Sequence, residues 1–257
     1  MDEMETVVVR GVEIGAGIPK VCVPIVGTTK EEIQQAAKNV IGQPIDLVEW
    51  RGDWFEDIFN FEKVEECLKE LRECLLETPI LFTFRTAKEG GEKSIEEREY
   101  VLLNQAVAKS GYVDLVDVEL FMGENVIKEI LEVAHEHGVK VIASNHDFAK
   151  TPEKEEIINR LKEMQQWGAD LLKIAVMPQS KKDVLTLLMA TEEMVTNYAK
   201  KPIITMSMAN TGVLSRLCGE VFGSALTFGA VGKTSAPGQI GVEDLRIALE
   251  ILHKSLV

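Results

Sequence analysis

Residues 139–176 read VKVIASNHDFAKTPEKEEIINRLKEMQQWGADLLKIAV, and this stretch decides the fold of the chain. It opens and closes with short apolar runs rich in β-branched residues, at 139–144 and 171–176. Between them, apolar residues recur at the spacing of one helix face, and Gly168 follows the last expected helical turn. The pattern predicts a strand, a helix and a second strand parallel to the first, because a crossover of this length joins parallel strands.

This strand–helix unit repeats from one end of the chain to the other. Apolar runs that predict strands lie at 21–26, 47–51, 80–85, 115–120, 139–144, 171–176, 203–207 and 225–231. They are almost wholly apolar, as strands covered on both faces are. Eight such units in 257 residues predict an α/β fold of the (β/α)8 TIM-barrel type, with residues 1–257 forming a single barrel domain.

The segment before the first run adds a second feature. Residues 7–14 read VVVRGVEI, which predicts two short strands around a turn, and we expect this N-terminal β-hairpin to close the bottom of the barrel. The competing architecture is a doubly wound open sheet. That architecture favours a GxGxxG fingerprint after the first strand, whereas the chain has Val26-Gly27-Thr28-Thr29 there.

Local signals mark the beginnings of two helices. Ser94 and Glu97, like Ser180 and Asp183, have the spacing of a capping box, in which both side chains bind backbone amides of the first helical turn. We therefore expect one helix to begin directly after Ser94 and another directly after Ser180.

Composition excludes several classes of function. With 28 Lys and Arg against 42 Asp and Glu, the net charge is −14, which disfavours nucleic-acid partners and anionic membrane surfaces. No apolar run approaches the length of a membrane span, and we expect no secretory signal because the first residues are acidic and precede no apolar segment. The four cysteines form no CxxC pair, so we expect reduced thiols and a cytoplasmic location. An anionic small molecule stays compatible with this charge, because a pocket can be locally basic.

Lys173 is the most informative residue, because it stands inside an apolar strand run. In a barrel of this kind, the chemistry lies at the carboxyl ends of the strands. Burial favours the neutral form of an amine, and a neutral amine can attack a carbonyl to form a Schiff base. The alternatives are an ion pair with Asp117 or Glu119, or an ammonium that reaches out to solvent.

A histidine follows another of the strand runs. Of the four histidines, only His146 lies at an expected strand end, and the other three lie on expected helices. The ordinary pKa of histidine lies near neutrality, so His146 is the natural proton carrier. The alternative is a structural hydrogen bond to Asp147.

Arginines follow several of the strand runs and point to an anionic ligand. Arg51, Arg85 and Arg216 lie at one expected rim, and a guanidinium matches a carboxylate with two hydrogen bonds. The alternative is that each arginine forms an ion pair with a nearby glutamate. Those glutamates are Glu49, Glu89 and Glu119.

Two further patterns are weaker. Residues 229–234 end like a phosphate-binding loop but lack its first glycine, so only a phosphate cup of backbone amides near Gly232 stays open. His146 with Asp117 and Glu119 has the residue types of a metal site, but one histidine and two carboxylates are a weak signal. A metal is also not needed if Lys173 forms an imine.

Taken together, the strand-end motifs resemble those of the type I 3-dehydroquinate dehydratases, enzymes of the shikimate pathway. The resemblance runs from the hairpin to the last helix, and each motif lies at an expected strand end in the family's order. The matching motifs are Glu49-Trp50-Arg51, Phe82-Thr83-Phe84-Arg85-Thr86, Glu89-Gly90-Gly91, Ser144-Asn145-His146-Asp147-Phe148, Lys173-Ile174-Ala175-Val176-Met177-Pro178, Thr205-Met206-Ser207-Met208 and Ser235-Ala236-Pro237-Gly238-Gln239.

The resemblance implies a hydro-lyase that dehydrates 3-dehydroquinate through an imine, without a cofactor or a metal. It implies that Lys173 forms the Schiff base with the C3 ketone, that His146 removes a C2 proton and then protonates the departing C1 hydroxyl, and that Glu89 orients His146. It also implies a homodimer. The substrate-binding residues that it implies are Glu49, Trp50, Arg51, Arg85, Arg216, Ser235 and Gln239.

Two other functions stay open on the residues alone. A class I aldolase acting on a sugar phosphate also uses a lysine on this strand, and the phosphate cup near Gly232 motivates that alternative. A catalytically silent barrel that binds a metabolite is expected to have lost Lys173 or His146, and both are present.

Overall fold

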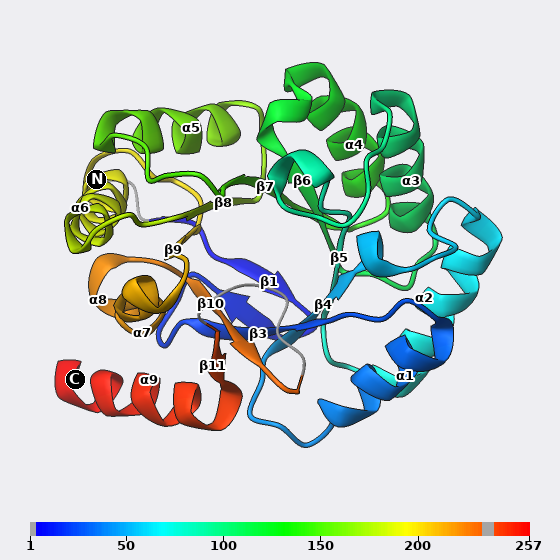
Figure 1. Ribbon diagram of the computed structural model, residues 1–257, viewed down its shortest axis with the longest axis horizontal. Coiled ribbons are helices and arrows are strands. Elements are labelled where there is room, and N and C mark those ends of the chain that lie inside the picture. Colours follow the sequence, from blue (N-terminus) through cyan, green and yellow to red (C-terminus); the bar gives the residue numbers. More distant parts are fainter. Residues whose placement is uncertain (1–3, 233–238) are drawn as a thin grey trace.

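The structure is a computed structural model that describes residues 4–232 and 239–257. Its main feature is a nine-stranded parallel sheet in which the strands from β3 to β9 follow one another in chain order, with β10 beside β3 and β11 beside β10. Figure 1 shows the strands curled into a ring. The strands are β3 (Lys20–Ile25), β4 (Leu47–Arg51), β5 (Ile80–Thr83), β6 (Leu115–Glu119), β7 (Lys140–Asp147), β8 (Leu171–Val176), β9 (Ile203–Ser207), β10 (Leu226–Ala230) and β11 (Ile240–Gly241).

The two ends of the curled sheet meet at β9 and β10. An isolated bridge pairs Ile203 with Ser224, and the Ala225 amide donates to the Ile203 carbonyl at 2.8 Å. The other neighbouring strands from β3 to β10 share ladders of three or more residue pairs. The predicted TIM-barrel fold is thus confirmed as a TIM-like curled sheet whose closure between β9 and β10 is thinner than the rest.

Helices cover the outside of the ring (Figure 1). The main apolar core lies between them and the outward faces of the strands, as an amphipathic helix requires. None of the helices in the described ranges is both long and apolar enough to cross a membrane. The helices are α1 (Lys30–Asn39), α2 (Phe61–Leu75), α3 (Glu97–Lys109), α4 (Glu124–Glu136), α5 (Lys154–Gln166), α6 (Lys181–Asn197), α7 (Val213–Leu217), α8 (Gly219–Phe222) and α9 (Val242–Leu256).

The N-terminal hairpin fills one end of the ring. Strands β1 (Val7–Val9) and β2 (Val12–Ile14) pair antiparallel. Their inward side chains join a second apolar cluster, inside the ring, with the first residues of several strands, such as Leu47 and Leu115. This confirms that the hairpin closes the bottom of the barrel and leaves the carboxyl ends of the strands for a site.

Aspartates just before alternate strands link neighbouring strands at the bottom of the barrel through hydrogen bonds. Asp46, Asp114 and Asp170 precede β4, β6 and β8, and each accepts a hydrogen bond from a backbone amide at or next to the first residue of the preceding strand. The carboxylate of Asp114 also forms two ion pairs, with Arg10 at the hairpin turn at 2.6 Å and with Arg72 on α2 at 2.5 Å. The hairpin is therefore fastened to the sheet by a charged contact as well as by apolar packing.

Two local expectations have different outcomes. The capping box of Ser180 and Asp183 at the start of α6 is confirmed. The one expected at Ser94 is wrong, because α3 begins at Glu97 after Glu96, with no side-chain cap. Strand β7 is also longer than predicted: it continues through His146, because His146 pairs with Ala175 of β8.

Candidate active site

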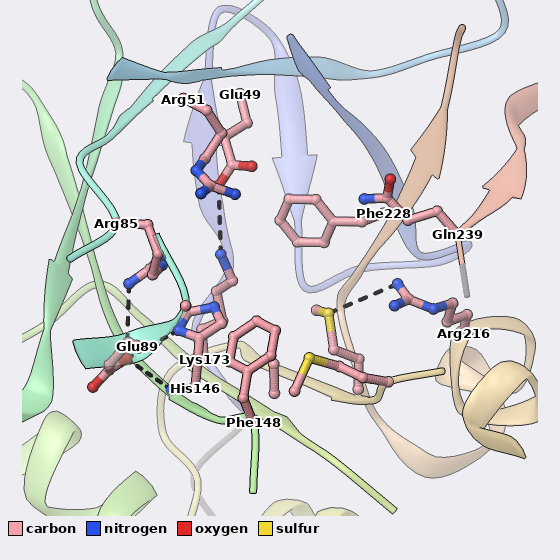
Figure 2. Close-up of a pocket in the computed structure, with 14 residues that line it drawn as sticks. Glu49, Arg51, Arg85, Glu89, His146, Phe148, Lys173, Arg216, Phe228 and Gln239 are labelled. Carbon is pink, nitrogen blue, oxygen red and sulfur yellow. Dashed lines mark hydrogen bonds and ion pairs between the residues drawn. The ribbon is translucent and has the colours of Figure 1, made fainter. Parts of the chain in front are cut away.

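A cavity opens at the carboxyl ends of the strands, opposite the hairpin. Figure 2 shows polar side chains from several strands and loops converging on it. Side chains of β4 and β8 form its floor, and loops after β5, β7 and β9 form its sides. The lining residues are Glu49, Arg51, Arg85, Glu89, Gly90, His146, Phe148, Lys173, Ala175, Met206, Met208, Arg216, Phe228 and Gln239.

Lys173 reaches into this cavity from β8. Strand alternation points it inward together with Ala175, and the residue is only 3% exposed. Its Nζ lies 3.2 Å from Asp117 Oδ2, 3.6 Å from Glu49 Oε1 and 4.6 Å from the centre of the Phe228 ring. The ion pair with Asp117, considered above as an alternative, is therefore present, and it holds the amine inside the cavity.

Arg85 holds the two acidic residues of β6. Its Nη2 lies 2.8 Å from Asp117 Oδ1, and its Nη1 lies 2.9 Å from Glu119 Oε1. Ser144 donates to Asp117 at 2.5 Å. Burial raises the pKa of Asp117, but the charges of Arg85 and Lys173 outweigh it, so the pKa lies below its usual value. Asp117 is thus a buried, charged carboxylate in contact with the amine.

His146, which is partly buried, pairs with the buried Glu89. Glu89 Oε2 accepts from the His146 amide at 2.8 Å and lies 3.1 Å from Nδ1 of the ring, which leaves Nε2 as the ring nitrogen away from Glu89 (Figure 2). The expected alternative contact between the His146 ring and Asp147 is replaced by this one. Burial, then the charges of Arg85, Lys173 and Arg51, hold the pKa of His146 well below its usual value. The imidazole is therefore neutral at neutral pH and able to accept a proton.

Glu89 has a shifted pKa of its own. Burial and the charge of Glu119 raise the pKa of Glu89 to about 7, against the charge of Arg85 and the hydrogen bonds that the carboxylate accepts. Glu89 sits in a short 3-10 turn, Ala87–Glu89, that follows β5. The turn ends at Gly90, where φ is +83° and an added Cβ would lie 2.4 Å from the Phe148 ring, so glycine is required there.

Arg51 is paired in a way that the sequence analysis missed. Its Nε and Nη2 each donate at 2.8 Å to the two oxygens of Asp53, a fully buried carboxylate. Asp53 also accepts from the Arg85 and Glu92 amides, at 3.3 and 3.1 Å. The side chain of Arg51 and the backbone amide of Arg85 are thus linked to one carboxylate in the 3-10 turn after β4. Arg51 pairs with this aspartate, whereas the alternative considered above paired each arginine with a nearby glutamate.

Arg216 and Gln239 lie on the side of the cavity opposite His146 and Glu89 (Figure 2). Arg216 is on α7, just after β9, and its Nη1 lies 3.9 Å from the sulfur of Met206. Burial lowers the pKa of Arg216 to about 10, so the guanidinium stays charged at neutral pH. A buried guanidinium beside an amide suits a carboxylate ligand.

The structure brings most of the predicted site residues to this one cavity. Trp50 instead lies outside the ring, with its ring centre 5.4 Å from that of Phe82 and 6.1 Å from that of Phe55. Successive side chains of a strand point to opposite faces, so β4 cannot point Glu49, Trp50 and Arg51 all inward. Ser235 lies outside the described residues.

Residues that the sequence analysis did not assign to the site include Asp117, Asp53 and Phe228. Asp117 had a usable signal, because it lies an even number of positions from Glu119 on β6 and shares its inward face. Asp53 had none, because it lies in a turn with no periodicity. The suggested metal site of His146, Asp117 and Glu119 does not form, since Arg85 stands at both carboxylates and His146 turns to Glu89.

Comparison with known proteins gives consistent results. A model of the family described as type I 3-dehydroquinase matches residues 21–256. The chain is 57% identical over 251 residues to a 3-dehydroquinate dehydratase of Listeria welshimeri, covering 98% of this chain and 99% of that protein. It is 56% identical over 248 residues to one of Clostridioides difficile, covering 96% and 97%. A crystal structure of the type I 3-dehydroquinate dehydratase from Clostridium difficile with covalently modified comenic acid superposes with a TM-score of 0.96 at 55% identity, covering 98% of this chain and all of that one.

Proposed function

The chain belongs to the type I 3-dehydroquinase family, and we propose that Lys173 is the residue through which it forms a covalent imine. The chain is a hydro-lyase of the shikimate pathway that acts on 3-dehydroquinate. The observation that carries the assignment of Lys173 is its Nζ, buried in the cavity with His146 and Arg216 on the surrounding walls. The family match leaves no reason to retain the sugar-phosphate aldolase or the silent barrel.

The first step joins Lys173 to the substrate. The neutral amine attacks the C3 carbonyl carbon, a C–N bond forms, and the carbonyl oxygen leaves as water, giving a protonated imine. The amine must first lose its proton. Asp117 and Glu49, at 3.2 and 3.6 Å from Nζ, hold the amine in place and stabilise the positive charge of the imine that follows.

The second step is proton transfer by His146. The imine draws electrons from C2, so the neutral ring can take a C2 proton at Nε2, while Nδ1 donates to Glu89. The C1 hydroxyl then takes that proton and leaves as water, which makes the C1–C2 double bond. Hydrolysis of the imine by a water molecule releases 3-dehydroshikimate and restores the amine of Lys173.

The remaining residues hold the substrate. Arg216 and Gln239 bind its carboxylate, since both line the same wall of the cavity. Glu49, Arg51 and Arg85 face the ring hydroxyls. Because Nε and Nη2 of Arg51 bind Asp53, Arg51 contacts substrate through Nη1. Trp50 supports this wall from behind through its packing on Phe82.

We also propose that the chain is a single domain and forms a homodimer. Helices α6, α8, α7 and α9 lie along one side of the ring (Figure 1), and each carries large apolar side chains that are exposed. Apolar side chains gathered on one side support an interface between subunits. All four cysteines are free thiols, which supports a reducing, cytoplasmic setting. The exposed side chains are Leu185, Met189, Val213, Leu214, Val221, Ile247, Ile251 and Leu256.

Trapping with borohydride tests the assignment of Lys173. The protein is mixed with 3-dehydroquinate, reduced, digested and mapped by mass spectrometry. We expect a stable adduct on the peptide with Lys173, none in Lys173→Ala, and an unchanged yield in the control Lys109→Ala on α3. An adduct on another lysine, or near-normal turnover by Lys173→Ala, would overturn the assignment.

A further inference from the structure

The carboxylate of Glu89 has a second hydrogen-bond partner besides His146, at the oxygen that does not contact the imidazole. Its Oε2 contacts His146, whereas its Oε1 accepts a hydrogen bond from Asn145 Nδ2 at 3.2 Å. Asn145 is fully buried and is the residue just before His146 on β7, so its side chain leaves the opposite face of the strand. It holds Glu89 from outside the ring while His146 holds it from inside.

A guanidinium determines which end of the Asn145 amide faces Glu89. Asn145 Oδ1 accepts from Arg160 Nη1 at 2.8 Å. Arg160 comes from α5, its side chain is 13% exposed, and its guanidinium carbon lies 5.1 Å from the centre of the Phe121 ring. Turning the amide over would put its oxygen against the Glu89 carboxylate and its NH2 against the guanidinium. Arg160 therefore forces Asn145 to donate to Glu89.

Glu89 needs such a restraint because a second cavity lies behind it. Glu89, His146 and Phe148 line the substrate cavity, and the same three residues line a neighbouring cavity together with Asn145 and Asp147. Without a donor on Oε1, the carboxylate has space to turn away from Nδ1. The ring nitrogen would then lose the acceptor that keeps its proton on Nδ1 and its lone pair on Nε2.

We propose that Asn145 and Arg160 are positioning residues for the reaction: Arg160 orients the Asn145 amide, Asn145 orients Glu89, and Glu89 orients His146. The inference rests on the proposed role of His146. Arg160 reaches the reacting atoms only through these contacts, and it links helix α5 to the cavity.

The chain of contacts has a titration signature. The groups that face Glu89 are Arg85 at the end of β5, Glu119 at the end of β6 and His146 on β7, with Lys173 and Arg51 acting on His146. Burial and Glu119 raise the pKa of Glu89, and the bonds from His146 and Asn145 lower it. Removing the Asn145 donor must therefore raise the pKa further, so that Glu89 protonates at a higher pH.

Kinetics of single and double variants test the proposal. For Asn145→Ala we expect kcat to fall about tenfold, KM to stay within about twofold, and the acid limb of the kcat profile to move up by about one pH unit, because a hydrogen bond to a charged group is lost. Arg160→Met, which removes the guanidinium but keeps a long unbranched side chain, should move both quantities in the same direction. The Asn145→Ala/Arg160→Met double variant should be no slower than Asn145→Ala alone, because Arg160 acts through Asn145.

Two controls make the outcomes decisive. Glu156→Ala removes the carboxylate that pairs with Arg160 Nε at 2.9 Å, and it should leave kcat and its pH profile unchanged. Borohydride trapping on Lys173 should persist in every variant, which separates this proposal from the proposed function: wild-type protein that forms no adduct refutes the function. The proposal would be overturned if the acid limb of the kcat profile stayed in place in Asn145→Ala. It would also be overturned if the kcat losses of the two single variants multiplied in the double variant. If Asn145→Ala does not fold, Arg160→Met with its pH profile decides alone.

Discussion

Lys173 contacts two carboxylates that differ in their other partners. Asp117 also binds Arg85 and Ser144, whereas Glu49 also accepts from the Thr83 hydroxyl at 2.9 Å. A buried lysine without a counter-charge is strongly destabilising, and the negative charges of Asp117 and Glu49 offset this penalty when no substrate is bound. The ion pair is therefore consistent with the catalytic role proposed for Lys173.

Replacing Asp117 tests this arrangement. Asp117→Asn keeps the size of the side chain but removes the charge opposite Lys173 and Arg85, so we expect a loss of about 3 kcal/mol in the free energy of unfolding. We also expect imine trapping to slow by about tenfold or more. The measurements are urea unfolding and the rate of borohydride-trapped adduct formation.

Glu119→Gln is the matched control for that variant. It breaks the other Arg85 pair at similar burial but touches no atom of Lys173. It should lower stability comparably and leave trapping at the wild-type rate. Wild-type trapping in Asp117→Asn would show that its carboxylate serves only Arg85.

The pair of Glu89 and His146 predicts a pH dependence. In the proposed mechanism the reacting form has a neutral His146 and a charged Glu89, and burial with the charge of Glu119 raises the pKa of Glu89 to about 7. We expect kcat to fall as pH drops below about 7, and Glu89→Gln to flatten this limb while lowering the plateau at least about tenfold. A kcat profile of wild type that stays flat down to pH 5 would contradict the assignment.

Stability should change in the opposite sense. The pKa of Glu89 is raised in the folded state, so the stability that its protonated form provides is complete below pH 4.5 and is lost as pH rises through about 7. The loss is on the order of 3 kcal/mol. Denaturant unfolding should therefore show Glu89→Gln gaining on wild type between pH 5 and 8. A pH-independent difference would show that the carboxylate is not buried in its charged form.

At the scale of elements, the strand ends explain why the site is so densely charged. Strand alternation puts Asp117 and Glu119 on one face of β6 and Ser144 and His146 on one face of β7. The ladder sets Glu119 opposite Ser144, and Ser144 opposite Lys173 of β8. Parallel registration thus puts Glu119, Ser144 and Lys173 at one level of the ring, while His146 lies opposite Ala175 at the next inward position.

The opposite ends of the strands carry the aspartates that serve stability alone. Asp114→Asn should lower the free energy of unfolding by about 3 kcal/mol, because it leaves Arg10 and Arg72 half-paired, and kcat should not change. Asp57→Asn, which breaks an exposed pair with Lys63, should cost less than about 1 kcal/mol. Thermal or urea unfolding measures both. Equal losses would mean that the hairpin contact contributes nothing beyond a surface pair.

At the scale of the whole molecule, the apolar side chains on α6 to α9 predict self-association. Light scattering should give a dimer mass for wild type, and Leu185→Glu with Ile251→Glu should give a monomer, because a charge buried at an apolar interface is costly. Leu102→Glu, on exposed surface of α3, is the control and should stay dimeric. A wild-type monomer at all concentrations would exclude the homodimer.

The sequence by itself determined the TIM-like fold, the hairpin at its base, the position of Lys173 inside a strand and the position of His146 at a strand end. These features follow from local periodicity. A run of apolar residues predicts a strand, and the carboxyl end of that strand predicts where the site lies in this fold. For the same reason, the inward direction of Glu49 and Arg51 was predictable from their spacing.

Only the tertiary structure decided which charged groups meet. Arg160 reaches Asn145 from the next helix, and Arg51 pairs with Asp53, which lies in a turn without periodicity. The pairing of Glu89 with His146 was expected only from the resemblance, since 57 positions separate the two residues. Trp50 was assigned to the site because its neighbours belong there, although alternation turns it outward. The direction of a side chain in a loop depends on backbone dihedrals and on partners distant in sequence, and neither leaves a repeating pattern in the chain.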